Sequence, residues 1–86
     1  MIKEIAKYIV DAGTSNTESG NWQITFDEIN SLFGTNLTTD ADTLGKIQDH
    51  IIENYPDMVA DIDCSEDFDV IFYTDCCPNY VDEHEP

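Results

Sequence analysis

The 86-residue sequence predicts a small α+β domain with three helices and a C-terminal β-hairpin. Two observations carry this prediction. Apolar residues recur at helical spacing in three segments before residue 56, and they alternate with polar residues in two short segments after it. Because the composition is 41% hydrophobic and the chain is short, we expect one domain with one small core.

The first helix is expected over residues 2–12, where apolar residues recur every three or four positions. These residues share one helical face: Ile2, Ile5, Ile9 and Ala12. Gly13 is expected to end the helix, because glycine is common at helix C-termini. A polar loop over 13–21 then leads to residues 22–24, whose apolar–polar–apolar order predicts a very short strand.

The second helix has the clearest local signal in the sequence. Thr25 can cap its N-terminus, and Glu28 three residues later completes a capping box. Two apolar residues flank the cap with the spacing of a hydrophobic staple: Ile24 and Ile29. We therefore expect a helix over residues 26–33 that ends at Gly34.

The third helix is expected to follow a threonine cap at position 38 or 39 and to run to about Asn54, where Pro56 closes it. Asp40 and Asp42 belong to its first turn, where the helix dipole favours acids. Its apolar residues share one face: Leu44, Ile47, Ile51 and Tyr55.

Two strands are expected next, over residues 58–63 and 68–73. In the first strand, alternate positions hold one set of apolar residues: Met58, Ala60 and Ile62. In the second strand, alternate positions hold three larger residues: Phe68, Val70 and Phe72. Because the segment between them is polar, residues 64–67 predict a turn and the two strands a hairpin.

The order of these elements resembles that of a winged helix, in which a helix-turn-helix is followed by a β-hairpin. This resemblance implies a single acidic, winged-helix-like domain over residues 1–75. Residues 76–86 are then an irregular acidic tail. A plain α+β domain with a different packing is the alternative.

Charge is the outlying feature of the composition. There are 19 Asp and Glu residues and only 3 Lys or Arg, which gives a formal net charge of −16. So few bases cannot neutralise a run of phosphates, and the sequence therefore excludes direct nucleic-acid binding. The same sign argues against an anionic membrane surface. Solubility and adaptation to a salty environment are the simpler explanations of the charge.

The sequence also indicates a location. No segment has the apolar length of a membrane span, and the N-terminal segment carries Glu4 and Asp11, unlike a signal peptide. The odd number of cysteines favours free thiols in a reducing compartment: Cys64, Cys76 and Cys77. We therefore expect a cytoplasmic protein.

The acidic residues predict a partner-binding surface with two parts. On the third helix, one acidic strip lies opposite the apolar face, with Lys46 beside it: Asp42, Asp49 and Glu53. The hairpin contributes a denser group: Asp61, Asp63, Glu66, Asp67 and Asp69. Asp61 and Asp63 should point the same way, about 6.6 Å apart along a strand, which is close to the rise between alternate phosphates of one DNA strand. Tyr73 is expected to add an aromatic anchor at the rim.

In size, charge and acidic hairpin the chain resembles the small phage-type DNA mimics, which include anti-CRISPR proteins, anti-restriction proteins and uracil-glycosylase inhibitors. The resemblance implies stoichiometric inhibition of a basic nucleic-acid-binding host protein. The preferred target is a Cas effector complex, because such complexes hold nucleic acid in positively charged channels. It further implies action as a monomer or homodimer in the cytoplasm of an infected or lysogenic bacterium.

Two other non-enzymatic functions are open. The first is a protein-interaction module with an apolar homodimer contact around Trp22 and Phe33. The second is a cation-binding domain, because the acids of residues 61–69 alternate as in a calcium loop. Glu66 and Phe72 stand where such a loop needs its sharp-turn glycine and closing glutamate, so no calcium site is expected.

Other kinds of site are weakly indicated. Cys76, Cys77 and His84 lack the ligand spacing of a zinc site, although a disulfide from Cys64 to one of the two adjacent cysteines is possible. His50 on the third helix is expected to be a surface residue. The sequence has no phosphate-binding glycine loop, nucleophile elbow or metal-binding helix motif. We therefore expect no enzyme, no cofactor and no metal.

Overall fold

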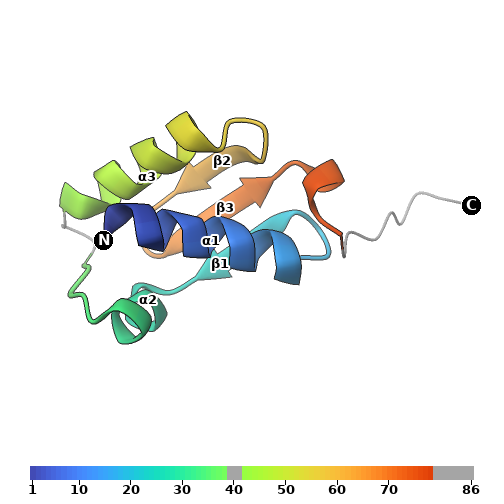
Figure 1. The fold of residues 1–86 in the computed structure, drawn as a ribbon. Coiled ribbons are helices and arrows are strands. Elements are labelled where there is room, and N and C mark those ends of the chain that lie inside the picture. Colours follow the sequence, from blue (N-terminus) through green and yellow to red (C-terminus); the bar gives the residue numbers. More distant parts are fainter. Residues whose placement is uncertain (39–41, 79–86) are drawn as a thin grey trace, which may run out of the picture.

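The computed structural model describes residues 1–38 and 42–78. It has the α+β architecture that the sequence predicts, in two layers (Figure 1). One layer is a three-stranded antiparallel sheet of order β1-β3-β2, formed by Asn21–Ile24, Val59–Asp63 and Phe68–Phe72 as β1, β2 and β3. Helices α1 (Ile2–Asn16) and α3 (Asp42–Asn54) pack on each other and cover one face of this sheet.

The sheet corrects the predicted element arrangement. Strand β1 pairs with β3, so the two C-terminal strands do not stand alone as a hairpin but belong to a larger sheet. Strand β1 lies between α1 and α2 (Phe26–Phe33), where the very short strand was predicted, and it begins one residue earlier, at Asn21. Where the predicted domain meets its predicted irregular tail, Thr74–Cys76 form a short 3-10 helix, η1.

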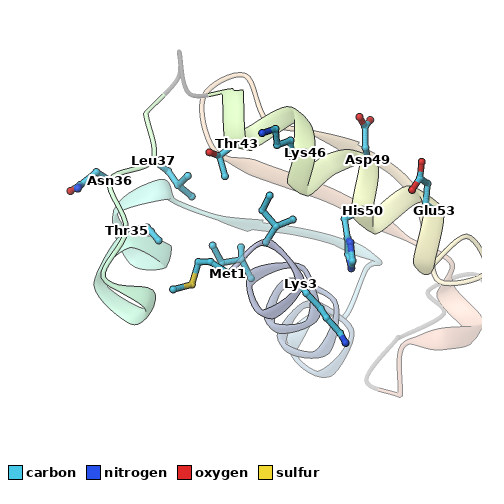
Figure 2. Close-up of a pocket in the computed structure, with 12 residues that line it drawn as sticks. Met1, Lys3, Thr35, Asn36, Leu37, Thr43, Lys46, Asp49, His50 and Glu53 are labelled. Carbon is cyan, nitrogen blue, oxygen red and sulfur yellow. The ribbon is translucent and has the colours of Figure 1, made fainter.

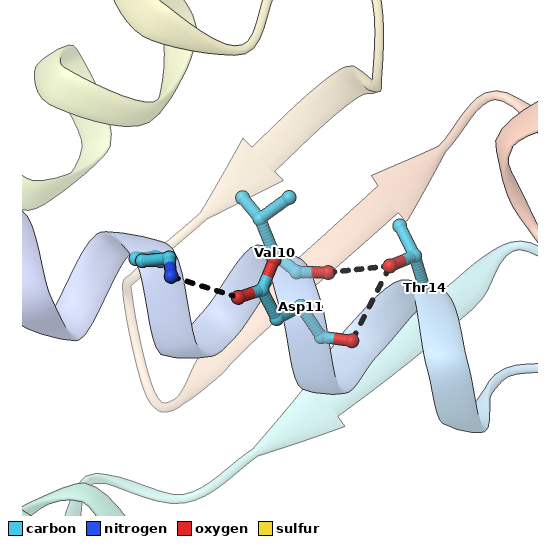
Figure 3. A network of polar contacts seen from close by, with 4 residues as sticks. Val10, Asp11 and Thr14 are labelled. Atoms are coloured by element: carbon cyan, nitrogen blue, oxygen red, sulfur yellow. Dashed lines mark hydrogen bonds and ion pairs between the residues drawn. The ribbon is translucent and has the colours of Figure 1, made fainter.

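Gly13 does not end the first helix, contrary to the prediction. Helix α1 continues to Asn16, and Gly13 is buried within it. A Cβ atom built on Gly13 would lie 2.5 Å from Cζ of Phe72 and 3.0 Å from Cε3 of Trp22, so the glycine lets the helix approach the sheet. Buried Thr14 in the next turn donates its hydroxyl to the Val10 carbonyl at 2.8 Å (Figure 3).

Helix α2 has the bounds that its capping signals predict. The Thr25 hydroxyl accepts a hydrogen bond from the Glu28 amide at 3.2 Å. Gly34 takes a left-handed conformation with φ of 67° at the other end. The Asn30 side chain then fixes the following loop, because its Oδ1 accepts from the Leu37 amide at 2.7 Å and its Nδ2 donates to the Leu37 carbonyl at 3.1 Å. Leu37 is thereby held in the core.

Helix α3 buries the apolar face predicted for it. Leu44, Ile47 and Ile51 are in the core, and Tyr55 just beyond the helix is half-buried. Position 38 is an exposed, non-helical threonine. The alternative cap at Thr39 and the first-turn Asp40 lie outside the described residues.

The core lies between the helices and the covered face of the sheet. Phe68 is fully buried on β3 and meets Phe26 of α2 edge-to-face, with ring centroids 5.1 Å apart. Val70 and Phe72 are buried on the same strand face, so the alternation predicted for β3 is confirmed. The intervening residues of β3 therefore point to the other side of the sheet.

The alternation predicted for the first of the two C-terminal strands is wrong at its beginning. Val59 pairs with Phe72 but Asp61 pairs with Ile71, so the register shifts by one residue and Ala60 has no partner. Val59 and Ile62 are buried while Ala60 is exposed. Beyond this β-bulge, Asp61 and Asp63 lie on one face of β2, as predicted.

Candidate interaction face

The face of the sheet that α1 and α3 leave uncovered carries the densest group of predicted site residues. We call it the open face. It is formed by the residues of each strand that alternate with the buried ones, together with Tyr73 just beyond β3: Asn21, Gln23, Asp61, Asp63, Asp69, Ile71 and Tyr73.

The open face has two cross-strand rows. In one row, Asp69 of the central strand lies between Gln23 of β1 and Asp63 of β2. In the other row, Ile71 lies between Asn21 and Asp61. Side chains directly opposite each other across antiparallel strands have Cβ atoms about 4.5–5.5 Å apart. Asp61, Asp63 and Asp69 therefore form one compact group of carboxylates.

Hydrogen bonds from neutral groups orient these carboxylates. Gln23 Nε2 donates to Asp69 Oδ2 at 3.3 Å. Ser65 donates to Asp63 twice, from its amide at 3.0 Å and from its hydroxyl at 3.2 Å. The Ile62 amide donates to Asp61 Oδ1 at 2.9 Å. None of these donors carries a charge, so they position the acids without neutralising them.

Ion pairs are confined to α1 in the part of the chain that the structure describes. The N-terminal amino group of Met1 lies 2.8 Å from Glu4, and Lys7 lies 3.8 Å from Asp11 (Figure 3). The first of these pairs lowers the pKa of Glu4, chiefly through the hydrogen bond from the terminal amino group. The carboxylates of the open face thus have no ion-pair partner among the described residues.

The turn between β2 and β3 extends the acidic surface at one end. Glu66 is exposed and Asp67 is half-buried. Cys64 lies beneath this turn, and burial, with a smaller effect of nearby Asp63, raises the pKa of its thiol to about 12. Cys64 is therefore a protonated, small apolar residue at neutral pH rather than a reactive nucleophile.

The acids of α3 form a separate group. Asp42, Asp49 and Glu53 are all exposed, as predicted. Figure 2 shows Asp49 and Glu53 pointing away from α1. Because α3 packs on the covered face of the sheet, its outer strip faces away from the open face. The structure therefore divides the predicted partner-binding residues between two opposite sides of the molecule.

A groove between α1, α3 and the loop at Leu37 was not predicted from the sequence. It has a volume of about 910 Å³ and an apolar floor that includes Ile5 (Figure 2). His50 of α3 points into it, so this residue is half-buried rather than an ordinary surface residue. Lys3 and Lys46 line the groove together with two acids, Asp49 and Glu53, so its lining carries charges of both signs.

Two exposed apolar side chains lie on the open face. Ile71 is 45% exposed and Tyr73 is 46% exposed. Tyr73 follows buried Phe72, has extended backbone and donates its amide to the Met58 carbonyl at 2.9 Å, so it continues the alternation of β3. Sequence reasoning named Tyr73 but missed Ile71. The available signal was an isoleucine at a position of β3 that alternation assigns to solvent.

The alternative apolar contact was placed around Trp22 and Phe33, two residues that lie at the edge of the core. Both side chains are half-buried and pack against the core. Trp22 lies over Gly13, and the Phe33 ring meets Tyr8 edge-to-face with centroids 5.8 Å apart. The exposed large apolar residues of the described chain are elsewhere: Met1, Leu32, Ile52, Ile71 and Tyr73.

The cysteines and the acids of residues 61–69 carry the side-chain types that could bind a metal ion. Cys64, Cys76 and Cys77 are free thiols, with Cys76 donating to the Asp57 carbonyl at 3.4 Å. Within residues 1–38 and 42–78, no His, Cys, Asp and Glu side chains gather in a group of three or more that could hold a metal ion. The acids Asp82, Glu83 and Glu85 and the proposed zinc ligand His84 lie outside the described residues.

Comparison with known proteins adds no family to this description: no protein-family model, curated protein or solved structure matches the chain. Among the described residues, none of the helices has the length and apolar character needed to cross a membrane.

Proposed function

We propose that this protein is a non-catalytic DNA-mimic inhibitor whose open face occupies a basic nucleic-acid-binding surface of a partner. One observation supports the proposal most strongly. Asp61, Asp63 and Asp69 share the solvent-facing side of the sheet, and every hydrogen bond that holds them comes from a neutral donor. A protein under selection for stability alone would place cations beside them, since like charges directly opposite each other destabilise a sheet.

The spacing of these carboxylates supports mimicry of a phosphate backbone. Asp61 and Asp63 are two residues apart on one strand, a separation of about 6.6 Å. Alternate phosphates of one DNA strand advance by a similar rise, about 6.8 Å along the helix axis. Asp69 adds a neighbouring charge across the strands. A basic surface that accepts a row of phosphates could therefore meet several carboxylates at once.

The order of elements supports a winged-helix-like origin for this scaffold. In the succession α1, β1, α2, α3, β2, β3, a pair of helices precedes two antiparallel strands, as in a helix-turn-helix followed by a β-hairpin. In DNA-reading proteins of that kind, the helix in the place of α3 enters the major groove. Here its outer strip carries Asp42, Asp49 and Glu53. An acidic strip in this place repels the phosphates of DNA, so α3 would not read DNA and the open face remains as the surface that meets a partner.

A Cas effector complex is the partner that we propose, acting in the cytoplasm of a bacterial host. Such complexes hold nucleic acid in positively charged channels and read a short duplex motif with basic side chains. The net charge of −16 would accelerate association with such a channel, and salt would weaken the attraction.

The test compares charge removal on the two opposite sides of the molecule. One variant combines Asp61→Asn, Asp63→Asn and Asp69→Asn, and its matched control combines Asp42→Asn, Asp49→Asn and Glu53→Gln. Both lose the same formal charge. The measurement is displacement of a fluorescent target duplex from a Cas effector complex at several salt concentrations.

We expect the open-face variant to displace the duplex at least about tenfold less well, and the control to stay within about threefold of the wild type. Equal losses in both variants would mean that only net charge matters, and would remove the open face from the proposal. If wild-type protein failed to displace duplex from any effector complex tested, an effector partner would be excluded.

A further inference from the structure

The open face combines carboxylates with an exposed apolar pair, and this combination indicates which basic side chain it accepts. Ile71 is an exposed residue near the end of β3, and exposed Tyr73 comes just beyond that end. Asp61 lies directly opposite Ile71, and Tyr73 follows two residues after Ile71 on the same side of the chain. Diagonal neighbours in an antiparallel sheet are within reach of aromatic and long side chains.

We propose that the open face is a docking surface for an arginine-rich segment of a basic partner, with an arginine guanidinium stacked on the Tyr73 ring and paired with Asp61. This inference rests on the proposed function, and it adds the chemistry of the partner residue. Complementary charge selects a cationic occupant, because the face carries acids and the described residues around it contain no lysine. The apolar pair then selects among cations.

Arginine fits this surface better than lysine for a physical reason. Its guanidinium group is planar and weakly hydrated, so it can lie on an aromatic ring while its edge donates two hydrogen bonds to a carboxylate. A lysine ammonium is compact and strongly hydrated, and it gains mainly from the nearby negative charge. Burying Ile71 and Tyr73 therefore favours a guanidinium, whereas the carboxylates alone would accept both cations.

The experiment uses two defined probes, nona-arginine and nona-lysine peptides, which carry the same number of side-chain charges. Their dissociation constants for the full chain are measured by calorimetry at about 0.15 M salt. We expect nona-arginine to bind about three- to tenfold more tightly than nona-lysine, the range that a stacked cation adds at a partly exposed ring.

Three variants separate the contribution of the Tyr73 ring to peptide affinity from the contribution of the surrounding negative charge. Tyr73→Leu keeps an apolar side chain but removes the aromatic face, so it should abolish the preference for arginine while leaving the affinity for nona-lysine within about twofold. Tyr73→Phe keeps the ring and should retain the preference. Leu32→Ala is the matched control, because Leu32 is 57% exposed on α2, away from the open face, and should change neither affinity.

The outcomes distinguish this inference from the proposed function. Equal wild-type affinities for the two peptides, or a preference that survives Tyr73→Leu, would overturn the arginine assignment while leaving the carboxylate face in place. The variant with Asp61→Asn, Asp63→Asn and Asp69→Asn should bind both peptides more weakly than the wild type. If its affinity for both peptides were unchanged, the proposed function itself would be contradicted.

Discussion

Asp63 and Asp69 lie directly opposite each other across the β2–β3 pair, on the face of the sheet that α1 and α3 leave uncovered. Two carboxylates in this relationship repel each other, and the groups that bond them, Ser65 and Gln23, are neutral. The fold tolerates this repulsion at a position where a lysine would have stabilised it. Such a choice is typical of a surface kept for binding rather than for stability.

Removing this repulsion should stabilise the protein. We expect Asp63→Asn to raise the free energy of unfolding by about 0.2–1 kcal/mol at low salt, with a smaller gain at high salt because ions screen the repulsion. Urea denaturation at two salt concentrations measures the effect. A gain that did not change with salt would indicate a cause other than charge. The same substitution should weaken partner binding, so stability and binding should change in opposite directions.

Substitution by alanine should change the stability of the protein in opposite directions at Gly13 of α1 and at Gly45 of α3. Gly13→Ala places a methyl group against the Phe72 and Trp22 rings and should destabilise the protein by about 1–3 kcal/mol. Gly45→Ala is the matched control, since a Cβ there meets nothing within 4 Å, and it should stabilise α3 by about 0.5–1 kcal/mol. Chemical denaturation of both variants checks the pair. Similar effects at the two sites would contradict the close approach at Gly13.

The N-terminal cap of α2 should contribute about 1 kcal/mol to the free energy of unfolding. Thr25→Ala removes the hydroxyl that accepts from the Glu28 amide, and helix N-caps of this kind typically contribute that much. Thr25→Ser is the control, because it keeps the accepting oxygen. Amide hydrogen exchange should show faster exchange in α2 for Thr25→Ala alone. Unchanged protection would mean that the core contacts of Phe26 and Ile29 hold the helix without its cap.

The buried thiol of Cys64 should make stability fall at alkaline pH. Burial raises its pKa from 9.0 to about 12, so the folded protein holds the thiol proton more tightly than the unfolded chain does. The stability that this difference contributes is complete below about pH 9 and is lost as pH rises toward 12. Cys64→Ala should reduce the slope of unfolding free energy against pH over this window. An identical slope in the variant would contradict the assignment to Cys64.

Local signals in the sequence were sufficient to predict the bounds of α2 and the buried apolar faces of α3 and β3. The cap at Thr25 and the left-handed Gly34 depend on hydrogen bonds between near neighbours, so their residue types predict the bounds of α2 directly. Gly13 was misread for the opposite reason. Its small size is needed by Phe72, which is distant in the chain, and no local pattern distinguishes such a glycine from a helix stop.

The candidate site was predicted residue by residue but not as a surface. Every predicted acid from Asp42 to Asp69 is at least partly exposed, which charge alone makes almost certain. Their division between two opposite sides depends on which face of the sheet α3 covers. That choice depends on the packing of Ile47 and Ile51 against the strands, and a single sequence does not encode it in any local pattern.

The bulge at Ala60 has a consequence for how copies of this protein behave when crowded. It lies on β2, an outer strand whose free side could template the addition of another chain. An unpaired residue breaks the regular run of donors and acceptors there, and the aspartates on either side of Ile62 repel an identical strand. Both features oppose the pairing of β2 with the same strand of another copy, so this edge of the sheet is a poor template for aggregation.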